Sequence, residues 1–72
     1  MDYLLTLGNR IRAKRNALGI SQGNFALMIG MNRDHMSEIE CGKKDPKLSS
    51  LIKISVGLGI PLSELIDGLE VE

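Results

Sequence analysis

Residues 21–41 read SQGNFALMIGMNRDHMSEIEC, and this stretch contains two short helical patterns separated by a glycine. In the first pattern Ser21 predicts an N-cap, because its hydroxyl can accept a hydrogen bond from an unpaired amide of the first turn. Apolar residues then recur on one face of this helix, and they are Phe25, Ala26 and Ile29. In the second pattern Asn32 predicts a cap of the same kind, followed by a narrow inward stripe of Met36 and Ile39. We therefore expect helices over residues 21–29 and 33–40.

The connection between these two helices is Gly30-Met31-Asn32. Gly30 stands where the first helix needs a left-handed residue to end, a conformation that glycine adopts with little strain. A three-residue turn of this chemistry between two short helices is typical of a helix-turn-helix. The motif is thus expected over residues 21–41.

The flanking sequence extends this pattern. Matching fragments occur at consistent spacing along the chain: Gly8 to Arg12, Arg15, Leu18 to Ile20, Gly42 to Lys44, Pro46, Leu48, Leu51, Ile54, Leu58 to Pro61, and Leu65. With the central motif they cover roughly residues 5–67, and the ordered set resembles the Cro/repressor-type (XRE-like) helix-turn-helix family of small bacterial and phage transcription regulators. The resemblance implies an all-α, five-helix, lambda-repressor-like DNA-binding domain. We expect residues 1–72 to form this single domain, with an acidic tail over residues 68–72.

Composition limits the other classes of protein. The 72 residues are 43% hydrophobic, with one Tyr, one Phe and no Trp, so the core of a single small domain must be aliphatic. One cysteine provides neither an internal disulfide nor a multi-cysteine zinc site, and one histidine adds too little for a metal site. We expect no cofactor and no catalysis. Without a targeting segment or a membrane span, a cytoplasmic location is expected.

The net charge is zero, but the charges are unevenly distributed. All nine Lys and Arg lie between Arg10 and Lys53, where four acids oppose them, and the other five acids lie outside this segment. Such an asymmetry lets one face meet phosphates while another stays acidic. An ordinary mixed surface is the alternative that charge alone leaves open.

A first helix is expected from Tyr3 to Ala17, with Asp2 or Thr6 as its cap. The resemblance implies that Arg15 pairs with Glu40, the glutamate that ends the reading helix. Such a partly buried pair would lock the first helix to the third. The alternative is two solvated charges that contribute less than about 1 kcal/mol.

The resemblance also implies that Arg33, Asp34 and Glu38 read base edges in the major groove. Arginine presents a bidentate donor fork to guanine, and a carboxylate can accept from the amino group of cytosine. In the alternative interpretation, Asp34 or Glu38 orients Arg33. Two acids on the reading edge predict modest affinity with sharp discrimination.

Phosphate contacts are expected on both sides of the reading residues. The resemblance implies one for Gln22, near the positive end of a helix dipole. The full set of expected phosphate contacts is Ser21, Gln22, Asn24, His35, Ser37, Lys43, Lys44 and Lys47. For the lysines, a solvated basic loop is the alternative. Gly23 departs from the family pattern, which usually has a strong helix former at this position, and glycine costs roughly 1 kcal/mol in a helix interior.

A fourth helix is expected from Pro46 or Lys47 to Leu58, with its apolar residues inward: Leu48, Leu51, Ile52 and Leu58, together with Ser55. Ser63 predicts the cap of a fifth helix, and residues 69–72 a fraying tail. A monomer reads about half a site, so a homodimer on a near-palindromic operator is expected, with half-sites about 34 to 36 Å apart or a multiple of that distance. Its expected contacts are Ile60, Pro61, Leu62 and Leu65, with Leu69 as a further candidate.

Two functions therefore remain at this point. The first is sequence-specific binding of duplex DNA by a repressor-type regulator. The second is an antitoxin or protein-interaction module, for which the acids of the third helix would suit a basic partner. A DNA-binding face should gather Arg33, Gln22 and the lysines, whereas a protein-binding face should present an apolar patch.

Overall fold

The computed structural model describes residues 2–71, and that part of the chain is helical without strands. Its elements in order are α1 (Tyr3–Ala17), α2 (Gln22–Ile29), α3 (Arg33–Glu40), α4 (Leu48–Leu58), α5 (Leu62–Ile66) and a short 3-10 helix, η1 (Leu69–Val71). Five α-helices match the expected fold class. The bounds of α1 and α3 agree with the sequence prediction.

The first three helices begin at side-chain caps. The Asp2 carboxylate accepts a hydrogen bond from the Leu5 amide at 3.0 Å, and the Ser21 hydroxyl accepts one from the Asn24 amide at 3.2 Å. Asn32 Oδ1 accepts from two amides of α3, those of Asp34 and His35. Gly30 then ends α2 with φ at 71°, the left-handed conformation that the turn requires. These local signals place the helix-turn-helix where the sequence predicts it.

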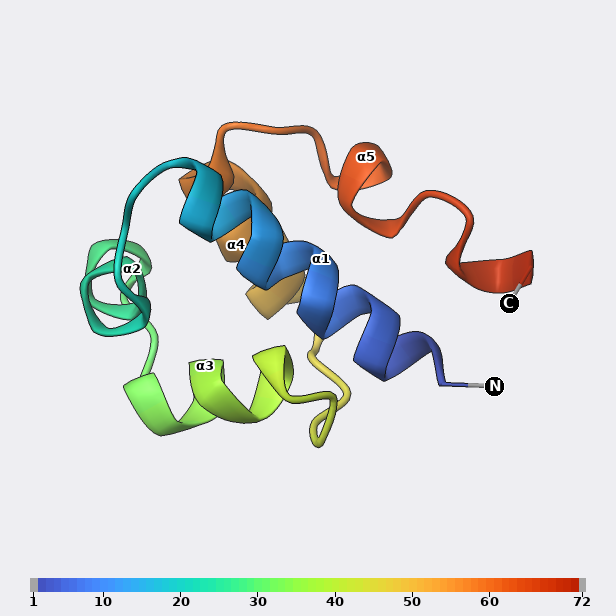
Figure 1. Cartoon of the computed structure of the whole chain (residues 1–72), viewed down its shortest axis with the longest axis horizontal. Coiled ribbons are helices and arrows are strands. Elements are labelled where there is room, and N and C mark those ends of the chain that lie inside the picture. Colours follow the sequence, from blue (N-terminus) through green and yellow to red (C-terminus); the bar gives the residue numbers. More distant parts are fainter. Residues whose placement is uncertain (1, 72) are drawn as a thin grey trace.

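Helix α1 runs through the middle of the molecule, as Figure 1 shows, and packs against α3, α4, α5 and η1. Helix α2 contacts both α3 and α4, so it joins the two sides of the bundle. In Figure 1, α3 and the loop after it form the lower edge, α2 lies at the left edge, and α5 lies on the opposite side of α1 from α3. The start of α1 and η1 lie at the same end of the molecule.

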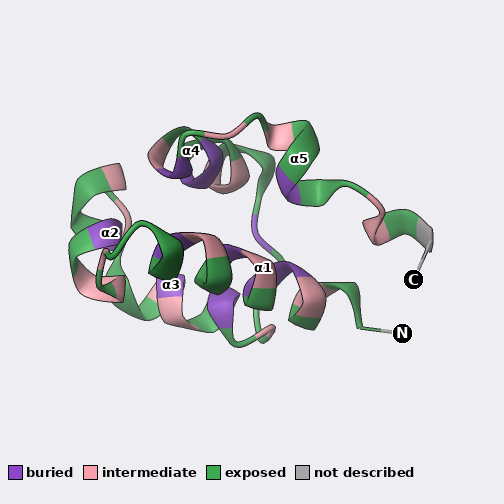
Figure 2. Cartoon of the chain, turned by 45° about the horizontal axis from the view of Figure 1, so that its top comes forward, coloured by how far each residue is buried: buried purple, intermediate pink, exposed green. Residues whose placement is uncertain are grey.

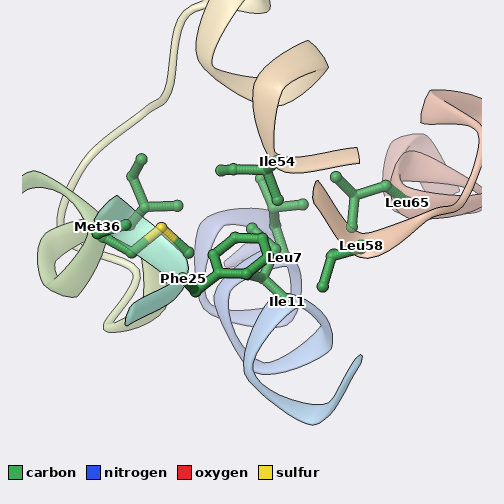
Figure 3. Packing of buried hydrophobic residues seen from close by; sticks show 9 residues of the cluster. Leu7, Ile11, Phe25, Met36, Ile54, Leu58 and Leu65 are labelled. Carbon is green, nitrogen blue, oxygen red and sulfur yellow. The ribbon is translucent and has the colours of Figure 1, made fainter. Parts of the chain in front are cut away.

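The core lies between α1 and the surrounding helices. Its buried residues are Leu7, Ile11, Phe25, Ala26, Met36, Ile39, Ile54, Leu58 and Leu65, and Figure 3 shows Phe25 among side chains from several helices. In Figure 2, each of the helices α1 to α5 carries buried positions, drawn in purple. Burial of this apolar set is the main favourable term for folding, at roughly 1.5–3 kcal/mol for each large side chain.

A glycine allows α1 to approach α3. A methyl group placed on Gly8 would lie 2.5 Å from the backbone oxygen of Glu40 and 2.6 Å from that of Ile39. These separations are far below van der Waals contact, so no larger residue fits at this crossing. The position of α3 on α1 thus depends on Gly8.

The structure confirms part of the predicted face of the fourth helix and corrects the rest. Ser55 and Leu58 are buried and Leu51 packs against the core, as predicted. Leu48 is 63% exposed and Ile52 is 46% exposed, whereas Ile54 is fully buried. The helix begins at Leu48, with Lys47 as its N-cap residue. Since nearly every position of α4 is apolar or small, its sequence fits more than one stripe at helical spacing, and its neighbours select the buried one.

The predicted start of the fifth helix and the predicted tail are also wrong. Helix α5 begins at Leu62 with Pro61 at the N-cap, so Ser63 lies inside the helix rather than capping it. Residues 69–71 form η1 instead of a frayed tail, and Leu69 packs against the core. The last residue of the predicted tail, Glu72, lies outside the described residues.

Candidate nucleic-acid interface

Three predicted base-reading residues project from α3. Arg33, Asp34 and Glu38 are all exposed, and within residues 2–71 no hydrogen bond of the Arg33 side chain and no ion pair of these three residues is present. The interpretation in which Asp34 or Glu38 orients Arg33 through an ion pair therefore finds no support. Asp34 also lies in the first turn of α3, where a carboxylate stabilises the positive end of the helix dipole.

At the other end of α3, Glu40 is completely buried and forms an ion pair with Arg15 of α1. Arg15 Nε donates to Glu40 Oε2 at 2.7 Å and Arg15 Nη2 donates to Oε1 at 2.9 Å, a bidentate geometry. Arg15 Nη1 donates to the carbonyl of Ile20, which fixes the loop before α2. The structure thus contains the pair that the family resemblance implies, and this pair joins α1, α3 and the entry to α2.

The surroundings of Glu40 keep it ionised. Burial alone would raise the pKa of its carboxyl, but hydrogen bonds from Arg15 and Gln22 and the nearby charges of Arg15 and Arg12 bring the pKa below its ordinary value of 4.5. In return, the hydrogen bond to Glu40 raises the pKa of Arg15, against the effect of burial. Both groups are therefore charged at neutral pH.

The sequence did not predict the contacts of Gln22 and Arg12 with Glu40. Gln22 Nε2 donates to Glu40 Oε1 at 3.1 Å, so the amide that we expected on a DNA phosphate is held by α3. Arg12 Nε lies 3.6 Å from the same oxygen while 46% of its side chain remains exposed. The spacing of Arg12 and Arg15 is the available signal, since residues three apart share a helix face.

The other predicted phosphate contacts differ in their exposure. Ser21 and Asn24 are exposed, whereas His35 and Ser37 are half-buried. The Ser21 oxygen accepts the capping hydrogen bond, which leaves its own hydrogen available for donation. Phosphate contact by each of these residues stays a prediction.

The loop from residue 43 to 47 presents Lys43, Lys44 and Lys47 to solvent. Asp45 in this loop accepts a hydrogen bond from the Tyr3 hydroxyl at 3.1 Å. That hydrogen bond and the charge of Asp45 raise the pKa of Tyr3. The contact ties the basic loop to the start of α1, and a separation of 42 residues gave no sequence signal for it.

On the opposite side of α1, two basic side chains bind the α5 end of the chain instead of remaining free. Arg10 Nη1 donates to the carbonyls of Leu65 and Asp67 at 2.9 and 2.8 Å, and Lys14 pairs with Glu64 at 3.0 Å. These two cations therefore hold the acidic α5 end of the chain. Other basic residues belong to α3 and to the loop after it: Arg33 begins α3, and the three exposed lysines follow the helix. Helix α3 and this loop lie along one edge of the molecule (Figure 1).

The predicted dimer contacts need one correction. Leu65 is fully buried in the core, because α5 turns this side chain toward α1 and α4, so it is not available to a second copy. Ile60 and Leu62 are half-buried and pack against the core, and Pro61 between them is exposed. Leu69, also expected as a candidate, is half-buried against the core.

Within residues 2–71 there is neither a candidate metal cluster nor a helix suited to a membrane. No group of three or more His, Cys, Asp and Glu side chains there is placed to hold a metal ion. None of the helices in that part combines the length and the apolar character that crossing a membrane requires.

The capped helix pair, its glycine turn and the buried ion pair beneath it define a helix-turn-helix domain. The Helix-turn-helix family model HTH_3 matches residues 11–65. The chain belongs to this family of transcription regulators.

Relatives of known class support this assignment. Control protein C.MunI of Mycoplasma sp. is 40% identical over 72 residues, covering 99% of this chain and 97% of that protein. The crystal structure of the restriction-modification controller protein C.AhdI from Aeromonas hydrophila matches with a TM-score of 0.83 and 32% identity, covering 86% of this chain and 94% of that one. The immunity repressor of Bacillus phage phi105 is 31% identical over 62 residues, covering 86% of this chain but 43% of the repressor.

Proposed function

We propose that the chain binds duplex DNA sequence-specifically through α3 and acts as a repressor-type transcription regulator. The observation that carries this proposal is the exposure of the polar side chains of α3. We call the surface formed by α3 and the lysine loop after it the α3 edge. Arg33, Asp34 and Glu38 are exposed without ion-pair partners in the described residues, while Glu40 on the same helix is buried and doubly bonded to Arg15. Direct reading of base edges requires a rigidly anchored helix whose exposed polar side chains are free to bind bases.

The basic loop supplies the second part of the interface. Lys43, Lys44 and Lys47 follow α3 directly and are exposed, so they can track a phosphate backbone when α3 enters the major groove. Phosphate contacts provide affinity that is independent of sequence and falls with salt. The acidic α5 side lies away from this edge and avoids repulsion of the DNA (Figure 1).

A homodimer on a near-palindromic operator completes the proposal. Helix α3 has eight residues and is about 12 Å long, so one copy covers roughly a third of a turn of DNA. A two-fold dimer would place a second α3 about 34 to 36 Å away, on the next half-site. The exposed turn at Pro61 is the proposed contact, with the half-buried Ile60 and Leu62 beside it.

The relatives favour a particular regulatory setting. Two of them are named as a control protein and a restriction-modification controller, and both align with this chain over nearly their whole length. We accordingly place this chain among regulators of a restriction-modification system. An operator upstream of restriction and modification genes in its source genome would support this assignment.

The test is selection from a randomised duplex library with the purified protein across a salt series, followed by sequencing of the retained DNA. We expect a palindromic motif whose affinity falls steeply with salt. Retained DNA without sequence enrichment, even at low salt, would contradict the proposal.

One observation favours a protein partner as the second candidate function. Leu27 and Met28 on α2 and Val56 on α4 are 80%, 54% and 74% exposed. Met28 and Val56 line a hollow of about 450 Å³ between the two helices. This is the apolar patch expected of a protein-binding face, and it occurs on a different surface from the α3 edge. A Leu27→Glu variant that binds DNA normally but loses regulation in cells would support this second function.

A further inference from the structure

Gly23, in the first turn of α2, lies against Arg33 at the start of α3. A methyl group placed on Gly23 would lie 3.6 Å from Arg33 Cδ, 3.7 Å from Nε and 3.8 Å from Cζ. These are ordinary van der Waals separations, so the stem and guanidinium carbon of Arg33 lie over the bare backbone of Gly23. The helix-turn-helix therefore brings its predicted guanine reader against a glycine ten positions earlier.

The backbone gives no other reason for glycine at this position. Positive φ angles occur at Gly19, Gly30, Gly42, Gly59 and Gly68, and Gly23 is absent from this set. Unlike Gly8, it is not pressed against the backbone of another helix, since Arg33 side-chain atoms are its nearest neighbours. Glycine also disfavours the helix relative to other residues, so its presence in α2 costs stability.

We propose that Gly23 is a positioning residue that sets the direction of the Arg33 guanidinium and thereby the base that Arg33 reads. This inference rests on the proposed function. The Arg33 side chain makes no hydrogen bond or ion pair within residues 2–71, so its stem is placed by packing, and the surface of Gly23 is one part of that packing. The donors of the guanidinium stay free for a base, and part of the ordering of the side chain precedes binding.

The size of residue 23 then controls the reading position. Alanine fits, because its methyl group meets Arg33 at 3.6 Å without a clash. A longer side chain occupies the place of the Arg33 stem and forces another rotamer, which redirects the guanidinium. Gly23→Gln is the informative change, because Gln favours a helix more than Gly and carries no charge. Gly23→Ala is its matched control.

The first measurement needs no DNA. In NMR spectra of the free protein, we expect nuclear Overhauser effects between the Gly23 Hα protons and the Arg33 Hδ protons. Gly23→Gln should shift the Arg33 Nε–Hε resonance, and Gly23→Ala should shift it less. Absence of the contact in the wild-type protein would overturn the inference before any binding experiment.

The second measurement compares base preferences of Gly23→Gln, Gly23→Ala, Arg33→Ala and the Gly23→Gln/Arg33→Ala double variant at every operator position. We expect Gly23→Gln to relax preference at the one position that Arg33→Ala relaxes, by roughly 5- to 150-fold, as for a lost bidentate contact. The double variant should resemble Arg33→Ala alone, and Gly23→Ala should keep the wild-type preference.

Three results would overturn the inference, and they have different meanings. An equal loss on all sequences, or a loss that adds to that of Arg33→Ala, would show that residue 23 acts independently of Arg33. An unchanged preference in Gly23→Gln would show that the contact has no role in reading. A wild-type protein that selects no sequence would refute the proposed function itself, even with the Gly23–Arg33 contact seen by NMR.

Discussion

The contribution of the buried Glu40 carboxylate to stability depends on its hydrogen-bond partners. Its carboxylate is fully buried and accepts two hydrogen bonds from Arg15 and one from Gln22. A charge in this position is tolerated only because its partners replace the lost water. The same contacts connect α1, α2 and α3, so one side chain fixes the relative positions of the three helices that form the proposed interface.

Replacing Glu40 by Gln should therefore be severe. The change keeps the shape of the side chain but leaves the Arg15 guanidinium buried without a counter-charge, and we expect a loss of about 3–5 kcal/mol in the free energy of unfolding. Urea denaturation provides the measurement. Glu64→Gln is the matched control, because Glu64 is half exposed in its pair with Lys14 and should cost less than about 1 kcal/mol. Equal small losses would refute the role assigned to Glu40.

The lowered pKa of Glu40 also predicts a pH dependence. Since the pKa is lower in the folded chain than its ordinary value of 4.5, the unfolded chain takes up the proton first as the pH falls. The stability that Glu40 contributes is thus complete above pH 4.5 and is lost as the pH falls through the folded-state pKa. Carbon-13 NMR titration of the Glu40 carboxyl reports this pKa directly. A midpoint above 4.5 would contradict the arrangement of Arg15, Gln22 and Arg12.

The sequence predicted the partners of a charged side chain only where the family resemblance named them. The Arg15 and Glu40 pair was expected in that way. The Gln22 contact was not, because an exposed amide near a helix start suits a phosphate as well as a carboxylate. Only the packing of α2 on α3 decides that the Gln22 amide reaches Glu40.

Among the elements, the crossing of α1 and α3 depends on Gly8. Gly8→Ala should destabilise the protein by about 1–3 kcal/mol, because the added methyl group would lie 2.5 Å from the Glu40 carbonyl oxygen. Gly23→Ala should instead stabilise it by up to about 1 kcal/mol, because its methyl group has room and alanine favours the helix. Urea denaturation of the two variants should give shifts of opposite sign. An unchanged midpoint for Gly8→Ala would mean that α1 and α3 can separate at little cost.

Sequence patterns predicted the helix caps better than the buried faces of the helices. Asp2, Ser21 and Asn32 cap helices as predicted, because a cap depends on the chemistry of one residue and the next turn. The buried face of α4 was predicted only in part, and the start of α5 was predicted wrongly. Apolar residues of α4 lie on more than one face, so the choice of the buried face depends on contacts with α1, α2 and α5 that local spacing does not contain. The first residue of α5 depends in the same way on its contacts with α1 and α4.

Over the whole molecule, the separation of charge predicts how salt acts on binding. Lys43→Ala should weaken binding to all sequences by a similar factor and reduce the slope of log affinity against log salt by about one unit, because one phosphate contact is lost. Fluorescence anisotropy with a labelled operator across a salt series measures this slope. Lys53→Ala is the control, since Lys53 lines the hollow between α2 and α4 rather than the α3 edge. A slope lowered equally by both variants would remove the lysine loop from its proposed role.

The proposed dimer contact cannot include Leu65, because this side chain is buried in the core of the monomer. Pro61 is the exposed residue of the proposed contact, so a charge there should disrupt a dimer without disturbing the core. We expect the wild-type protein to bind a full palindrome at least about tenfold more tightly than a single half-site, since the second contact is effectively intramolecular. Pro61→Glu should abolish this difference and leave half-site affinity unchanged.

Leu27→Glu provides the comparison, because it introduces the same charge at a residue that is 80% exposed on α2. If the dimer forms through the turn at Pro61, this variant keeps the full advantage on the palindrome. If Leu27→Glu removes the advantage and Pro61→Glu keeps it, the two copies meet through the apolar surface of α2 and α4 instead. Sedimentation of each variant on both duplexes distinguishes one bound copy from two, and it separates a lost dimer from a lost DNA contact.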